Sequence, residues 1–372
     1  MAFLIPIFLG VLQLILFVFH LFEYEVIVTV FEITNPVILL VLQIILGALS
    51  VSFVLASILE SFFNNRFTRV VYRIAAVWLG FLTYLIVADI IFYVILAALL
   101  PFNVGMRVVA LIGKVLLAFA LGITLYGLYN ARRMRVTRLD LKFDKLPESW
   151  KGKRAVWVSD LQLGQVYGKG FSEKVVNKIK TLNPDIVFVG GDLYDGVAID
   201  VDASIAPFST LRPPLGMYFI TGNHEEFNDN APYLSAVHKV GMKSLIDESV
   251  NVDGVELVGV DYTSTEKKTN FQNILGGLTK DKSKFYILLK HAPAHVSVAA
   301  DEGVSLMICG HTHRAQMAPL NVLTHFIYKG YDYGLKKAGD MLEYTSSGAG
   351  TWGPPLKVGS KSEIVLVTFD RT

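Results

Sequence analysis

Cysteine is almost absent from this chain of 372 residues, which contains only Cys309. A single cysteine cannot form a disulfide within the chain, so the sequence excludes a small disulfide-rich secreted scaffold. An excess of either charge is also lacking, because 34 Lys and Arg residues nearly balance 32 Asp and Glu residues. Without a basic excess there is no electrostatic case for nucleic-acid binding, and we expect no nucleic-acid partner.

Charged residues are scarce before residue 130 and have ordinary frequency after it. The whole chain is 53% hydrophobic with a mean hydropathy of +0.48, which is too apolar for an ordinary soluble enzyme. Apolar stretches that are long enough to cross a bilayer, which takes about 20 residues, run over Ala2–Leu21, Val37–Leu59, Ala75–Leu100 and Val108–Tyr129. Because no basic segment follows Met1, we interpret the first stretch as a span and not as a signal peptide. Residues 1–131 are therefore predicted to form an α-helical transmembrane bundle of four spans, with the lipid bilayer as partner.

The basic residues between the spans predict the orientation, because Lys and Arg are enriched in cytoplasmic loops. The second connection contains Arg66, Arg69 and Arg73, and the segment after the fourth span contains Arg132, Arg133, Arg135 and Arg138. The first connection contains Glu23, Glu25 and Glu32 without Lys or Arg, and the third has only Arg107 beside it. This alternation predicts an integral membrane protein whose N-terminus and soluble domain are both cytoplasmic. Residues 132–153 are expected to be a basic juxtamembrane linker.

Two ionisable residues, Asp89 and Lys114, lie deep within the third and fourth spans. They are equally far from an expected turn near Pro101 and Phe102, so they should lie at matching depth. Charged groups inside a membrane usually pair with one another, and we expect an Asp89–Lys114 ion pair. The alternative is that Lys114 extends to the headgroups and Asp89 is protonated.

Short β-branched runs from residue 154 onward are predicted to be strands, and nearly all of them end in Asp, Asn or His. The runs are Arg154–Ser159, Asp185–Val189, Met217–Thr221, Glu256–Val260, Phe285–Leu289 and Ser305–Ile308. A helix is predicted over Ser172–Leu182, with Ser172 as its N-cap. Since strands of an α/β sheet present their following loops at one edge, these side chains should gather there. Hard oxygen and imidazole donors in one place indicate a divalent metal site.

The ordered blocks resemble those of the calcineurin-like metallophosphoesterases, whose pattern is D-x-H, G-D-x-x-D, G-N-H-E/D, a lone H, and G-H-x-H. Here they are Asp160-Leu161-Gln162, Gly191-Asp192-Leu193-Tyr194-Asp195, Gly222-Asn223-His224-Glu225, His291, and Gly310-His311-Thr312-His313. The tail Ser347–Pro355 also resembles the membrane-associated bacterial branch. The resemblance covers the whole soluble half, residues 154–372, and implies an α/β/β/α sandwich.

The resemblance also implies a role for each matching residue. Asp192 would bridge two divalent metal ions, for which we expect Mn²⁺, with Fe²⁺, Zn²⁺ or Mg²⁺ as alternatives. The other ligands would be Asp160, Gln162 and His313 at one metal, and Asn223, His291 and His311 at the other. A metal-bridging hydroxide would attack phosphorus. His224 would contact the phosphoryl oxygen or protonate the leaving group, and Asp195 would orient His224.

Gln162 departs from the family pattern, which has histidine at this position. An amide oxygen can coordinate a metal, but it is neutral and a poorer donor than imidazole for borderline metals. We expect a weaker first site that favours manganese or magnesium, or a Gln162 side chain that faces substrate. Loss of the dinuclear centre is the remaining alternative.

The predicted function is metal-dependent hydrolysis of a phosphodiester or pyrophosphate bond, in a phosphate-containing substrate that is linked to a lipid. A membrane anchor would give the enzyme access to such substrates. Two alternatives stay open. In the first, the substrate would be a soluble nucleotide or cyclic nucleotide. In the second, a catalytically weakened phosphatase fold would regulate a membrane sensor formed by the spans.

Overall fold

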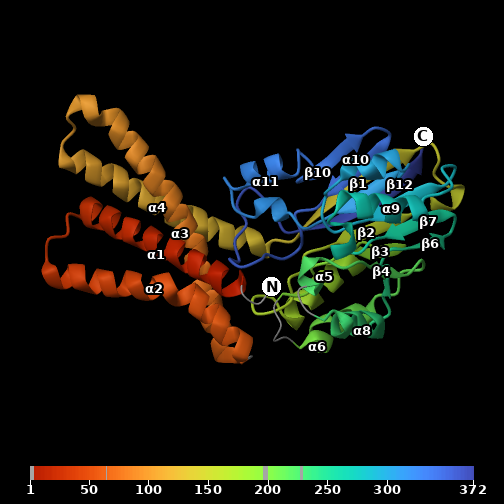
Figure 1. Cartoon of the computed structure of the whole chain (residues 1–372), viewed down its shortest axis with the longest axis horizontal. Coiled ribbons are helices and arrows are strands. Elements are labelled where there is room, and N and C mark those ends of the chain that lie inside the picture. Colours follow the sequence, from red (N-terminus) through yellow and green to blue (C-terminus); the bar gives the residue numbers. More distant parts are fainter. Residues whose placement is uncertain (1–3, 64, 196–199, 227–228) are drawn as a thin grey trace. The chain divides into compact units, whose positions relative to one another are not determined.

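A computed structural model describes residues 4–63, 65–195, 200–226 and 229–372 (Figure 1). The chain divides into two compact units. The helical unit comprises Met1–Tyr129 with Gly353–Leu356, and the C-terminal unit comprises Asn130–Trp352 with Lys357–Thr372.

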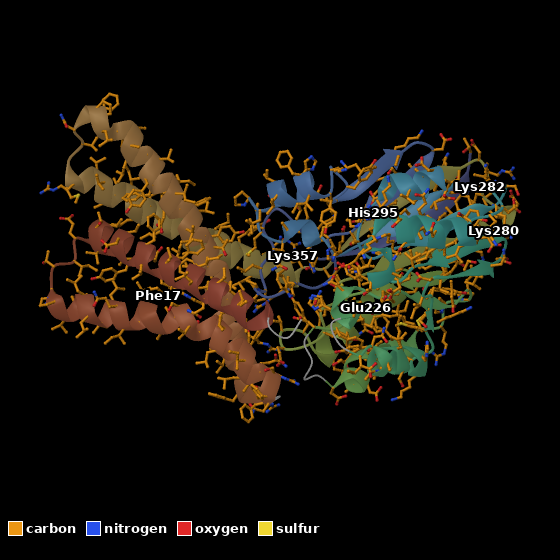
Figure 2. The ribbon with its side chains drawn as sticks, in the orientation of Figure 1. Phe17, Glu226, Lys280, Lys282, His295 and Lys357 are labelled. Atoms are coloured by element: carbon orange, nitrogen blue, oxygen red, sulfur yellow. The ribbon has the colours of Figure 1, made fainter. Side chains whose placement is uncertain are left out.

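The helical unit contains helices α1 (Leu4–Phe31), α2 (Pro36–Phe62), α3 (Arg66–Leu99) and α4 (Met106–Arg132), with a short 3₁₀ turn η1 (Leu100–Phe102). All four long helices are apolar enough to cross a membrane, which confirms the predicted spans. Many of their large apolar side chains point outward. Phe17 on α1 is 46% exposed (Figure 2), and Val94 on α3 is 64% exposed. Such outward apolar surface is stable in lipid and unfavourable in water.

Helix α1 extends further than the predicted first span and ends at Phe31. The apolar sequence resumes after Glu25, so two acidic residues do not stop the helix. Glu23 and Glu25 therefore lie inside α1, and the connection to α2 is only a few residues long. Asn35 is the N-cap of α2, and its side chain accepts hydrogen bonds from the backbone N–H groups of Val37 and Ile38.

The predicted Asp89–Lys114 ion pair is wrong. Asp89 on α3 is 1% exposed, and its carboxyl group is hydrogen-bonded to Glu23 on α1, which is also 1% exposed. Lys114 is exposed, and its ammonium lies 5.5 Å from the ring centroid of Phe31. Two carboxyl groups can hydrogen-bond only if one of them carries a proton. Asp89 is therefore paired with Glu23 and not with Lys114, while Asp89 Oδ2 and Glu23 Oε2 have no hydrogen-bond partner among the described residues.

The C-terminal unit contains two six-stranded sheets. In spatial order the first contains β1 (Arg135–Phe143), β12 (Glu363–Arg371), β2 (Arg154–Val158), β3 (Ile186–Val189), β4 (Met217–Phe219) and β5 (Lys243–Ser244). The second contains β10 (Gly334–Ala338), β11 (Met341–Thr345), β9 (Leu306–Cys309), β8 (Phe285–Leu289), β7 (Val255–Gly259) and β6 (Glu248–Val252). Strands β2, β3, β4 and β5 are parallel to one another, and so are β7, β8, β9 and β11.

Side-chain alternation along each central strand fills the layers. On β3, Ile186 and Phe188 pack between the two sheets, whereas Val187 and Val189 pack against helices. The first sheet is covered by α5 (Lys169–Lys180), α6 (Val201–Ile205) and α8 (Ala231–Lys239), and the second by α9 (Lys268–Leu278) and α10 (Val296–Asp301) (Figure 1). This arrangement confirms the predicted α/β/β/α sandwich. Short elements complete the unit: α7 (Asn223–Glu226), α11 (Asn321–Ile327), η2 (Glu148–Trp150), η3 (Ala206–Thr210), η4 (Thr263–Thr265) and η5 (His313–Ala315).

Two expectations differ from the structure in this unit. Residues 132–153 are not a linker, because Arg135–Phe143 forms β1 and pairs in parallel with β12 along its whole length. The physical reason is the alternation of Leu139 and Leu141 with charged residues, which buries one face of the strand. Helix α5 begins at Lys169 after Gly168, so Ser172 lies within the first turns and does not cap the helix.

Candidate metal centre

The predicted ligands follow the carboxyl ends of parallel strands in both sheets. Asp160 lies just after β2, Asp192 after β3 and Asn223 after β4. His291 follows β8, and His311 follows β9. Loops at the carboxyl ends of parallel strands share one edge of a sheet, which brings side chains that are far apart in sequence together.

Three of these residues form a compact cluster that could hold a metal ion. One ligand atom each from Asp192, His291 and His311 lies within 4.8 Å of the others. His291 Nε2 is 3.3 Å from Asp192 Oδ2, and His311 Nδ1 is 3.2 Å from His291 Nε2. Asp192 and His291 are buried. A buried carboxylate with two imidazoles is a typical donor set for a divalent transition metal.

A second group of predicted ligands is linked to this cluster through Asp160. His313 Nε2 lies 3.6 Å from Asp160 Oδ1, which also accepts a hydrogen bond from the backbone N–H of His311 at 2.9 Å. Ser159 Oγ donates to the other carboxylate oxygen of Asp160 at 2.5 Å. Asp160 therefore holds the His311–His313 loop in place while one of its oxygens faces His313.

The remaining predicted ligands bring buried polar atoms that lack a hydrogen-bond partner among the described residues. These atoms are Gln162 Oε1, Asn223 Oδ1 and His313 Nδ1. Gln162 Nε2 donates to Asp192 Oδ2 at 3.0 Å. A buried acceptor without a partner costs about 1–3 kcal/mol, and a metal ion would remove that cost for an amide oxygen. The donor set at the site therefore fits divalent cations.

Backbone conformation singles out the same residues. Positive φ angles occur at Asp160 (56°), Gln162 (52°), Asp192 (50°), His311 (70°) and His313 (48°). Left-handed backbone at a residue other than glycine is uncommon and clusters at functional sites, where the surrounding structure enforces it. Five of the seven predicted ligands are held in this way.

Burial and mutual charge set the protonation states of the cluster. Burial lowers the pKa of His291, but the negative charge of Asp192 outweighs it and raises this pKa to about 9. Burial and the neighbouring His291 lower the pKa of His311 to about 3. Burial raises the pKa of Asp160 to about 6. A proton thus sits on His291 near neutral pH, and a metal ion that binds there must displace it.

His224 and Asp195 lie beside the cluster as a hydrogen-bonded pair. His224 Nδ1 is 3.3 Å from Asp195 Oδ1, and His224 Nε2 is 3.8 Å from Asp192 Oδ2. Burial lowers the pKa of His224, but its hydrogen bond to Asp195 and the charge of Asp192 outweigh burial, so this pKa is raised. The ring centroids of His224 and Trp352 are 6.5 Å apart. A protonated imidazole in this position can donate to an anion.

Sequence reasoning assigned no role to Glu225, which is fully buried at the centre of the site. Its carboxylate accepts hydrogen bonds from the backbone N–H groups of Asp192, Leu193, Tyr194 and Gly222, at 2.8 to 3.2 Å. A Cβ added at Gly222 would lie 2.2 Å from Asp192 Oδ1, so only glycine fits there. Glu225 fixes the loops that carry Asp192 and Asn223, and its place in the G-N-H-E block was the available signal.

The segment after β11 braces the loop of Asp160. The backbone N–H of Gly350 donates to the carbonyl of Asp160 at 2.8 Å. Lys357, labelled in Figure 2, is fully buried, and its ammonium donates to the carbonyls of Ser347, Gly348 and Lys361. Burial lowers the pKa of Lys357 to about 7. The predicted tail motif thus has a structural function, while Lys357 itself was missed because an isolated lysine gives no signal.

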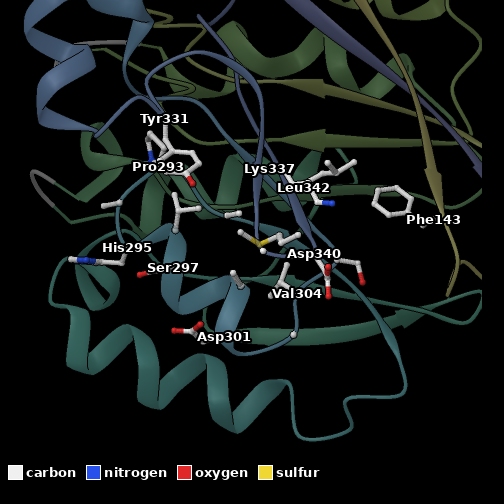
Figure 3. A pocket seen from close by; sticks show the side chains of 18 of the residues that line it. Phe143, Pro293, His295, Ser297, Asp301, Val304, Tyr331, Lys337, Asp340 and Leu342 are labelled. Carbon is white, nitrogen blue, oxygen red and sulfur yellow. The ribbon is translucent and has the colours of Figure 1, made fainter.

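A cavity of about 1280 Å³ lies elsewhere, between β1, α10 and β10 (Figure 3). Phe143, His295, Asp301, Tyr331 and Lys337 are among the residues that line it. None of the seven predicted metal ligands does. The metal cluster is therefore not part of this cavity.

Comparison with known proteins agrees with this geometry. A sequence profile described as "Calcineurin-like phosphoesterase" matches residues 153–315. A "Transmembrane protein with metallophosphoesterase domain" of Danio rerio is 31% identical over 265 residues, which cover 66% of this chain and 60% of that one. A metallophosphoesterase of Helicobacter pylori strain J99 is 32% identical over 246 residues, which cover 65% of each chain.

A metallophosphoesterase of Aquifex aeolicus is 30% identical over 242 residues, which cover 63% of this chain and 92% of that one. The match extends over nearly the whole of this relative, whereas it spans only 60–65% of the first two. This chain belongs to the calcineurin-like metallophosphoesterase family.

Proposed function

We propose that the chain is a membrane-anchored, metal-dependent phosphoric ester hydrolase. The observation that carries the proposal is the convergence of Asp192, His291 and His311, with ligand atoms within 4.8 Å of one another, at the edge of two apposed sheets. Membership of the family and the four apolar helices support it.

Two divalent cations would be held by the seven predicted ligands. Asp192 would be the ligand shared by both cations. Asp160, Gln162 and His313 would complete one set, and Asn223, His291 and His311 would complete the other. When bound, the cations supply Lewis acidity and offset the negative charge of a phosphate ester. We infer manganese as the preferred metal, with iron, zinc or magnesium as alternatives, because the donors mix oxygen with imidazole.

His224 is proposed to donate a proton or a hydrogen bond to the substrate. Its raised pKa keeps it protonated closer to neutral pH. Asp195 holds the ring through Nδ1, at 3.3 Å, which leaves Nε2 directed toward the side of Asp192. Asp195 is therefore a positioning residue for the acid.

The C-terminal unit and the N-terminus are proposed to be cytoplasmic. Support comes from basic residues at the start of α3 and at the end of α4, namely Arg66, Arg69 and Arg73 in one place and Arg132 and Arg133 in the other. Connections on the other side have few basic residues, as the positive-inside rule requires.

For the substrate we favour a phosphodiester or pyrophosphate in a lipid-linked molecule. The anchor keeps the site near the membrane, and Trp352, 61% exposed beside His224, offers an apolar contact at the site. A soluble nucleotide or cyclic nucleotide is the second substrate class. A third role is a catalytically weakened fold that regulates a membrane sensor formed by the helices. The hydrogen bond from Gln162 to Asp192 favours it, because the amide nitrogen of Gln162, which cannot coordinate a metal ion, faces the proposed shared ligand.

The test uses the full chain in lipid nanodiscs, with bis-p-nitrophenyl phosphate and added Mn²⁺. We expect hydrolysis that Asp192→Ala abolishes and that Lys280→Ala, a change at an exposed residue far from the site in sequence, leaves intact. Phosphate release from lipid extracts and from nucleotides then separates the substrate classes. Equal rates for the wild-type chain and Asp192→Ala would refute the proposed hydrolase.

A further inference from the structure

Exposed apolar side chains of the C-terminal unit concentrate on one short segment. Among the described residues after Tyr129, the exposed large hydrophobic ones are Leu320, Val322, Leu323, Phe326, Ile327, Leu335 and Trp352. Five of these seven lie within residues 320–327, which contain α11, and Phe326 is the most exposed at 74%. A contiguous patch of this kind on a folded domain indicates a contact surface.

Two polar side chains of α11 contact Asp332 in the C-terminal unit, although the His325 side chain is itself 60% exposed. Thr324 Oγ1 donates to Asp332 Oδ2 at 3.4 Å, and His325 Nδ1 lies 3.0 Å from Asp332 Oδ1. Asp332 itself is buried. An ordinary surface helix buries its apolar face and exposes its polar face. Helix α11 instead buries none of its residues and exposes all of its large apolar side chains, which indicates that this face meets an apolar environment.

A chain of hydrogen bonds connects α11 to the C-terminal end of α4. Asn130 Nδ2, close to that end, donates to the carbonyl of Lys357 at 2.7 Å. The next residue, Val358, accepts a hydrogen bond from the backbone N–H of Ala318 at 2.8 Å. Helix α11 begins three residues after Ala318. All of these residues belong to the C-terminal unit, so α11 is fixed near the point where the fourth span ends.

That point lies at the membrane surface. The span ends at Arg132, and only Arg133 and Met134 separate it from β1. Arginines at the end of a span sit at the level of the lipid headgroups. Helix α11 has seven residues and is therefore about 10 Å long at 1.5 Å per residue, which is short enough to keep its whole length near the headgroups.

We propose that α11, together with Leu320, docks into the bilayer surface from which the fourth span emerges. The occupant of the apolar face is lipid, at the boundary between headgroups and acyl chains. Exposed Lys329 after the helix, and Arg132 and Arg133 after the span, add positive charge that suits anionic headgroups.

Docking would connect the membrane to the metal site. Thr312, between His311 and His313, donates through Oγ1 to the carbonyl of Asp332 at 2.6 Å. The ring centroids of Tyr328 and His311 are 6.1 Å apart. The loop that carries two predicted ligands therefore contacts residues that follow the docked segment, Tyr328 directly and Asp332 five residues later. This consequence rests on the proposed function, whereas the docking itself does not.

The test measures lipid contact directly and needs no enzyme activity. Cys309 is buried, so a cysteine introduced by Phe326→Cys can be labelled selectively with the fluorophore NBD. The labelled full chain is reconstituted into phosphatidylcholine–phosphatidylglycerol vesicles that carry nitroxide-labelled lipids. Lys280→Cys, at an exposed position between α9 and β8 (Figure 2), is the matched control. Leu323→Cys tests a second position on the apolar face.

We expect nitroxides near the top of the acyl chain to quench the labels at 326 and 323 severalfold more than the label at 280. The depth should be roughly 5–10 Å below the headgroups. Equal quenching at all three positions would overturn the proposal. A blue-shifted emission at 326 without lipid quenching would also overturn it, because the face would then be covered by protein. A chain that shows the expected lipid quenching but no hydrolysis would contradict the proposed function and leave the docking proposal intact.

Discussion

At the scale of single residues, Gln162 is the departure from the family pattern with the clearest consequence. Its amide nitrogen donates to Asp192, which leaves Oε1 without a partner among the described residues. Gln162→His would replace this amide with an imidazole donor. We expect metal affinity to rise by about 10-fold or more, measured by metal content after dialysis against a graded chelator.

The control for this prediction is Gln162→Ala, which removes both the hydrogen bond and the candidate ligand. It should bind metal no more tightly than the wild-type chain. If Gln162→His and Gln162→Ala had the same metal content, position 162 would not be a ligand position.

Glu225 yields a second prediction at this scale, for stability. Its carboxylate accepts four backbone hydrogen bonds, and an amide can accept only through its one oxygen. Glu225→Gln should therefore leave donors unpaired, at about 1–3 kcal/mol for each, and lower the midpoint of thermal unfolding. Glu226→Gln is the matched control, since Glu226 is only half-buried and accepts from the Asn230 side chain (Figure 2). A neutral result at both positions would contradict the structural role of Glu225.

At the scale of elements, the fold could be predicted where the pattern of apolar residues along the sequence was unambiguous. The apolar runs that became β2, β3, β8 and β9 were bounded by glycine and ligand residues, and their predicted positions agree with the structure within about two residues. Strand β1 was missed because its charges were interpreted as a topology signal, although Leu139 and Leu141 alternate with Asp140 and Lys142. The partner strand β12 lies more than 200 residues further along the chain. The local sequence around β1 therefore gives no information about this pairing.

The candidate site shows the same division between local and distant information. Motif order predicted the ligand residues, but it contained no information on which other residues hold them in place. Glu225 and Lys357 act through backbone groups of other segments, and such contacts follow from tertiary structure. The partner of Asp89 was missed for a related reason, because equal distance from a turn assumes that only adjacent helices α3 and α4 interact.

The Glu23–Asp89 pair gives a prediction for the helical unit. Asp89→Leu removes the hydrogen-bond partner of a buried carboxyl group and should destabilise the bundle by about 1–2 kcal/mol. Lys114→Met changes an exposed side chain and should have little effect. Unfolding of the full chain in mixed micelles with increasing denaturing detergent measures both. A larger loss of stability for Lys114→Met than for Asp89→Leu would instead favour the Asp89–Lys114 ion pair.

At the scale of the whole molecule, metal binding and folding should be linked. The predicted ligands come from both sheets of the sandwich, from Asp160 after β2 to His313 after β9. An ion bound there stabilises the folded state by about 2.7 kcal/mol at a concentration 100 times its dissociation constant. Removal of metal should therefore lower the unfolding temperature of the entire C-terminal unit and not only loosen the loops.

The pH dependence of this linkage follows from His291. Without metal, its pKa of about 9 lies above the unfolded value of 6.5. The protonated His291–Asp192 pair therefore stabilises the metal-free fold fully below pH 6.5, and this contribution is lost as the pH rises through 9. Metal must displace the same proton, so its affinity should increase across this window by up to about 1.4 kcal/mol per pH unit.

The rise in unfolding temperature caused by Mn²⁺ should be larger at pH 8.5 than at pH 6.5. Thermal scans of the full chain with Mn²⁺ and with chelator measure it, and Asp192→Asn should show no rise at either pH. An equal rise at both pH values would mean that no proton leaves His291 when metal binds.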